Sequence, residues 1–97
     1  MLKHIVMFKC KDGVSRNDPR VAAAYARLEQ LPGQIPEVRE WEQGVNVSGR
    51  DIAYDFALSS AFESQESLQC YSDHPAHRAV VALLREICTW HIVDYFV

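Results

Sequence analysis

The chain has 97 residues, of which 48% are hydrophobic and 24% charged, and this composition excludes a disordered, fibrous or low-complexity protein. Its length gives room for a single domain over residues 1–97 with one hydrophobic core. The net charge is −3. Residues 1–50 contain eight basic and six acidic residues, and residues 51–97 contain two basic and seven acidic ones. Neither half has the excess of basic residues that is typical of nucleic-acid binding, so we expect no nucleic acid as a partner.

The first predicted element is a strand over residues 2–10 that is apolar on both faces. One face carries Leu2, His4, Val6, Phe8 and Cys10. The other face still presents Ile5 and Met7, which need a cover if helices pack on only one side of the sheet. In so short a chain a second copy is the simplest cover, so we predict a homodimer, with a monomer as the alternative.

A helix is predicted next, with Asp18 as its N-cap and Pro19 at its first position. Its apolar face consists of Val21, Ala24, Tyr25 and Leu28. We expect the helix to end near Leu31, before Pro32 and Gly33.

Two strands are predicted at about residues 37–47 and 54–62, with a turn at 48–51 between them. A short helix capped by Ser64 follows and is interrupted at His74, since a residue before proline is driven out of helical geometry. Pro75 restarts the helix, and residues 90–97 alternate as a last strand. The order βαββαβ predicts an α+β, ferredoxin-like sandwich, with a four-stranded antiparallel sheet and two helices on one face.

The longest apolar run, residues 79–84, is far short of the roughly 20 residues that cross a bilayer, and neither helix pairs an apolar face with a lysine-rich one. We therefore expect no membrane association. The N-terminus lacks a signal-peptide pattern, so we expect a cytoplasmic location. Cys10, Cys70 and Cys88 form no close pair in the sequence, so free thiols are expected.

Four segments resemble the stress-responsive A/B barrel (Dabb) domain family. They are the opening strand KHIVMFK at 3–9, the segment 54–64, the motif His74-Pro75-Ala76-His77 and the closing Val93-Asp94-Tyr95. The resemblance covers essentially the whole chain. It implies a dimeric α+β barrel with a cavity between sheet and helices, and no single reaction. One plant branch of the family cyclises polyketides without a cofactor.

The resemblance implies where a site would lie. The tyrosine and histidine of the cyclase branch fall on Tyr71 and His77, our candidate catalytic residues. A histidine can take a proton from a carbon acid, and a phenol can donate a hydrogen bond to the resulting enolate. The candidate ligand-binding residues are His4, Val6, Phe8, Tyr25, Leu28 and His74.

Each polar candidate also has a structural interpretation. His74 stands at a helix break, where ring nitrogens commonly cap backbone groups, and His77 lies at the edge of an apolar helix face. Tyr71 and His4 have alternative interpretations as core residues with satisfied polar atoms. We expect no metal, because His74 and His77 supply two ligands and no third completes them, and no cofactor is expected.

Three functions remain open at this point. The preferred one is a dimer that binds a small apolar or aromatic molecule. The second is a cofactor-free acid–base enzyme, either polyketide-cyclase-like or, as Trp41 and Trp90 suggest, similar to the monooxygenases that share this barrel. The third is a structural stress protein without a ligand.

Overall fold

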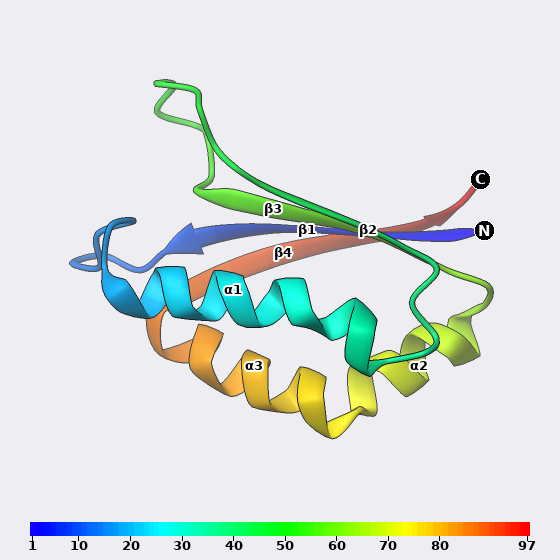
Figure 1. Ribbon diagram of the computed structural model, residues 1–97. Helices are drawn as coiled ribbons and strands as arrows, with labels where there is room; N and C mark the ends of the chain where they lie inside the picture. Colours follow the sequence, from blue (N-terminus) through cyan, green and yellow to red (C-terminus); the bar gives the residue numbers. More distant parts are fainter.

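A computed structural model describes all 97 residues of the chain. Its elements are β1 (Leu2–Cys10), α1 (Pro19–Gln34), β2 (Glu40–Val45), β3 (Phe56–Phe62), α2 (Gln65–Asp73), α3 (Pro75–Ile87) and β4 (Cys88–Phe96). The strands form one antiparallel sheet in the order β2-β3-β1-β4, and the helices all lie on one side of it (Figure 1). This is the predicted α+β ferredoxin-like fold. No helix has the length and apolar character needed to cross a membrane.

The sheet has two unlike faces. The covered face, which meets the helices, includes the buried side chains of His4, Val6 and Phe8 on β1. The bare face is the opposite one, and its apolar residues include Ile5, Met7, Val93 and Tyr95. It carries no helix (Figure 1). The residues predicted to alternate along β1 therefore point in turn to the side packed against the helices and to the open side.

Helix α1 continues to Gln34, so its predicted end near Leu31 is wrong. Pro32 removes only its own N–H from the helix, and the N–H of Ile35 still donates to the carbonyl of Leu31 at 2.9 Å. Leu31 and Ile35 are both fully buried in the core. Packing of these two side chains therefore holds the last turn of the helix despite the proline.

Strands β2 and β3 are shorter than predicted, because residues 46–55 leave the sheet as a loop that rises beyond it (Figure 1). The side chain of Asn46 bonds to both the N–H and the carbonyl of Ser48, at 3.0 and 2.8 Å, and so bends the chain locally. At the other end of β2, the N–H of Val38 bonds to the carbonyl of Ile35 in a turn. One bond between the two strands still continues past each end of β2, from the N–H of Asn46 to the carbonyl of Asp55 and from the N–H of Arg39 to the carbonyl of Ala61, both at 2.9 Å.

Strand β4 lies at the sheet edge, and its register with β1 decides which of its residues face the helices. His4 pairs with Asp94, Val6 with Ile92, and Phe8 with Trp90. Paired residues in an antiparallel sheet point to the same face. Asp94, Ile92 and Trp90 therefore lie on the covered face beside the residues of β1.

Candidate functional site

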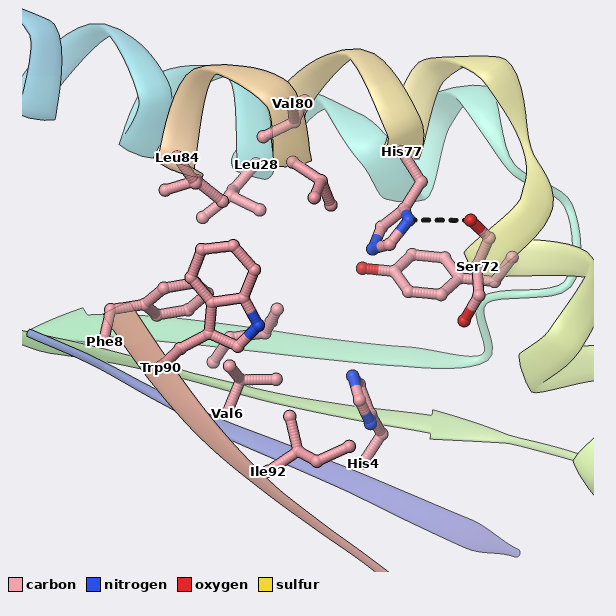
Figure 2. A pocket seen from close by; sticks show the side chains of 13 residues that line it. His4, Val6, Phe8, Leu28, Ser72, His77, Val80, Leu84, Trp90 and Ile92 are labelled. Atoms are coloured by element: carbon pink, nitrogen blue, oxygen red, sulfur yellow. Dashed lines mark hydrogen bonds between the residues drawn. The ribbon is translucent and has the colours of Figure 1, made fainter. Parts of the chain in front are cut away.

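A cavity of about 190 Å³ lies between the sheet and the helices (Figure 2). Thirteen residues line it, ten of them hydrophobic. They are His4, Val6, Phe8, Leu28, Leu58, Tyr71, Ser72, His77, Val80, Val81, Leu84, Trp90 and Ile92. An apolar cavity of roughly 150 Å³ is enough to hold benzene, so this space accommodates a small organic molecule.

The cavity has an apolar end and a polar end. Phe8 and Trp90 form the apolar end, with ring centroids 5.9 Å apart, whereas His4, Ser72 and His77 lie together at the other end (Figure 2). Ile92 lines the cavity although 58% of its surface is exposed. The cavity therefore opens to solvent at the β4 edge of the sheet.

The position of His77 follows from the helix break. The carbonyl of Ser72 lies at the end of α2, where carbonyls lack helical partners, and the Nδ1–H of His77 in the first turn of α3 donates to it at 3.0 Å (Figure 2). A carbonyl only accepts, so in the neutral ring Nε2 carries the lone pair. Burial lowers the pKa of His77, with smaller contributions from the nearby His4 and His74, so the ring is neutral at pH 7.

Tyr71 is almost fully buried at the end of α2, and its ring packs against His77 with centroids 4.4 Å apart. Its ring also packs against Phe62 and His4, at 5.0 and 6.2 Å. The hydroxyl makes no hydrogen bond with the protein although the residue lines the cavity. Burial raises the pKa of Tyr71, so the phenol stays protonated at neutral pH and keeps a proton to donate.

His4 projects from near the start of β1 into the polar end of the cavity (Figure 2). Its Nδ1 lies 2.5 Å from the Oδ1 of Asp94, the residue paired with it on β4. An N–H donated to a carboxylate is a charge-assisted hydrogen bond, which fixes the ring orientation. The bond leaves Nε2 of His4 as the atom available to a ligand.

Six of the eight predicted site residues line this cavity: Tyr71, His77, His4, Val6, Phe8 and Leu28. The other two lie elsewhere. Tyr25 packs edge-on against Phe56, with ring centroids 5.6 Å apart, outside the cavity lining. His74 ends α2 and caps α3, where its Nδ1 accepts the N–H of Ala76 at 3.0 Å.

Several residues of the site were missed from the sequence. Trp90 and Ile92 alternate along β4, which indicates a shared face but not which face. The helical spacing of Val80 and Leu84 indicates an apolar stripe but does not separate cavity lining from core. Asp94 is predicted from the sequence only as part of the closing motif Val93-Asp94-Tyr95 and not as a site residue, because its role depends on the pairing of β4 with β1.

No three histidine, cysteine, aspartate or glutamate side chains converge to hold a metal ion. Cys10, Cys70 and Cys88 are free thiols. What the polar end offers is a neutral imidazole with an unprotonated nitrogen, a protonated phenol and a second imidazole held by a carboxylate. Such groups bind an oxygen-bearing ligand or move a proton at a carbon next to a carbonyl.

Comparison with known proteins gives a consistent result. The family model for the stress responsive A/B barrel domain matches residues 2–97. An uncharacterized protein of Streptomyces coelicolor is 50% identical over 95 residues, which cover 98% of each chain. Olivetolic acid cyclase of Cannabis sativa is 27% identical over 78 residues, covering 78% of this chain and 75% of its own.

Among solved structures, a dimeric ferredoxin-like protein of unknown function from Thermobifida fusca superposes with a TM-score of 0.86. It is 27% identical, and the match covers 99% of this chain and 90% of that one. The fold is therefore found in a relative that is described as dimeric.

Proposed function

This chain belongs to the stress responsive A/B barrel domain family, and we propose that it is a homodimer that binds a small apolar or aromatic molecule in the cavity between sheet and helices. The observation that carries this proposal is the cavity itself, with ten hydrophobic lining residues and polar groups gathered at one end. Ligand sites typically combine an apolar wall with a few convergent polar groups. A molecule with one or two rings and an oxygen function satisfies both ends.

The ligand's oxygen function would meet the Tyr71 hydroxyl and Nε2 of His77 at the polar end. Neither group has a protein partner, and neither is sealed off, because every fully buried side-chain nitrogen or oxygen of the chain has a hydrogen-bond partner. A ligand oxygen in that place would therefore meet one free donor and one free acceptor. Phe8 and Trp90 would hold the aromatic part, since offset or tilted ring contacts add to simple burial.

Titration with the neutral fluorophore N-phenyl-1-naphthylamine tests the binding proposal. Val81 lines the cavity, so Val81→Phe should fill part of it and lower the affinity at least tenfold. Leu83 is on the same helix but outside the lining, and Leu83→Phe is the matched control that should leave the affinity unchanged. Absence of binding to the unaltered protein, or equal binding by both variants, would contradict the proposal.

The dimer part of the proposal rests on the bare face. Met7, Val93 and Tyr95 are 46%, 54% and 46% exposed on a sheet face that no helix covers. Two such faces related by a two-fold axis would bury these side chains against each other. The relative from Thermobifida fusca, which is described as dimeric, supports a dimer.

A second candidate is a cofactor-free acid–base enzyme acting on a carbonyl compound. The observation in its favour is that an unprotonated Nε2 on His77 and a protonated Tyr71 hydroxyl belong to rings only 4.4 Å apart. Nε2 would take a proton from the carbon next to the carbonyl, and the electron pair would move to the enolate oxygen. Tyr71 would donate a hydrogen bond to that oxygen. The similarity to olivetolic acid cyclase supports this candidate.

Proton exchange tests this second candidate without knowledge of the natural substrate. Acetophenone and phenylacetone carry acidic C–H bonds next to a carbonyl, and their exchange in D₂O is followed by NMR. The protein should accelerate exchange, and both His77→Gln and Tyr71→Phe should reduce the acceleration by 10²-fold or more, as a rough estimate. Exchange at the buffer rate with the unaltered protein would count against it.

A further inference from the structure

A shallow groove of about 330 Å³ lies along α3 and adjoins the cavity. It is lined by Ser72, His77, Arg78, Val81, Ala82 and Arg85. Ser72, His77 and Val81 line the cavity as well, so the two spaces meet at a shared wall. A ligand in the cavity that reached past these three residues would lie in the groove.

The groove is positively charged in an otherwise acidic half of the chain. Arg78 and Arg85 are the only lysine or arginine residues after Arg50, and both line this groove, together with no acidic residue. Both are exposed, and neither forms an ion pair. No acidic residue lines the cavity either, and Asp94 on β4 is bonded to His4.

The spacing places the two arginines along one side of the helix. They are seven residues apart, which is two turns and about 10 Å along the axis. The groove and the cavity meet at the residues between and beside them, His77 and Val81. An anionic group leaving the cavity at this wall would lie within reach of the guanidinium groups, which bind oxyanions through paired N–H donors.

We propose that the natural ligand is an amphipathic organic anion whose apolar body occupies the cavity and whose oxyanion group is bound by Arg78 and Arg85 in the groove. This inference rests on the proposed ligand-binding function and adds the chemical class of the ligand. The arginines would act as specificity determinants, since they favour a charged ligand over its neutral analogue. Their contribution is exposed to solvent and therefore falls as salt concentration rises.

Two fluorophores with the same aromatic skeleton distinguish the contribution of the ligand's charge to binding from that of burying its rings. 8-Anilinonaphthalene-1-sulfonate carries an oxyanion, and N-phenyl-1-naphthylamine does not. In low salt, the double variant Arg78→Gln/Arg85→Gln should weaken binding of the sulfonate about tenfold and leave binding of the neutral probe unchanged. The control Arg27→Gln/Arg50→Gln removes two other exposed arginines, neither of which lines the groove, and should weaken neither probe.

The outcomes separate this inference from the proposal beneath it. If neither probe binds the unaltered protein, the ligand-binding function itself fails. If the neutral probe binds and the Arg78/Arg85 variant retains full affinity for the sulfonate, the groove inference alone is overturned. Equal losses of sulfonate affinity in the variant and the control would also overturn it, because the effect would then come from net charge.

Discussion

The two faces of the sheet are built from the same strands and have opposite properties. On β1, Val6 and Phe8 are 5% and 3% exposed against the helices, whereas Met7 between them is 46% exposed. Both faces carry apolar side chains, although the bare face also carries charged ones, among them Lys3 and Glu40, which form an ion pair at 3.0 Å. The difference shows that the covered face stabilises the fold and encloses the cavity, and that the bare face is free for association.

The largest expected effect is on the covered face. Phe62→Ala removes a fully buried ring that packs against Tyr71, and it should lower the free energy of unfolding by about 3–5 kcal/mol. Urea unfolding at a fixed protein concentration measures the change. Val47→Ala, at a fully exposed position, is the control and should change it by less than about 0.5 kcal/mol. A loss below about 1 kcal/mol for Phe62→Ala would mean that the covered face is not the core.

A substitution on the bare face should change the association of two chains rather than the folding of one. Met7→Lys places a charge in each half of the proposed interface and should weaken the dimer at least a hundredfold, because a buried unpaired charge costs several kcal/mol. Light scattering should then give the monomer mass at micromolar concentration, while Met7→Leu keeps the dimer. A monomeric mass for the unaltered protein would refute the dimer proposal.

A smaller effect is expected where the covered face reaches the sheet edge. Asp94→Asn keeps an acceptor for the Nδ1–H of His4 but removes the charge that strengthens this bond. The bond is partly exposed, so stability should fall by only about 1 kcal/mol, seen as a drop of a few degrees in Tm. An unchanged Tm would show that Asp94 does not hold His4 through its charge.

The smallest effect concerns pH. The pKa of His77 is lowered by burial from its ordinary 6.5, so the unfolded chain takes up this proton before the folded one as pH falls. His77 therefore contributes to a loss of stability as the pH falls through 6.5 to its folded pKa. His77→Gln should show a smaller drop in Tm over this interval than the unaltered protein. Parallel Tm curves would mean that the ring is not desolvated.

Much of the fold could be predicted from the sequence, because local patterns carry it. Alternation along residues 2–10 separated the two faces of β1, and Pro75 placed the break between α2 and α3 at His74. Where a prediction was wrong, tertiary packing or side-chain bonding outweighed the local preference. Helix α1 passes through Pro32 because Leu31 and Ile35 are anchored in the core, and the chain turns out of the sheet after β2, where the side chain of Asn46 bonds to Ser48.

For the site, the sequence by itself determined which chemical groups are present and on which elements they lie, with Tyr71 and His77 flanking the break and His4 on the first strand. Only the tertiary structure decided which of them meet. The register of β4 against β1 set Asp94 opposite His4, and the angle at the break aimed His77 at the Ser72 carbonyl. Strand register and helix orientation depend on contacts between residues far apart in the chain, which no local pattern encodes.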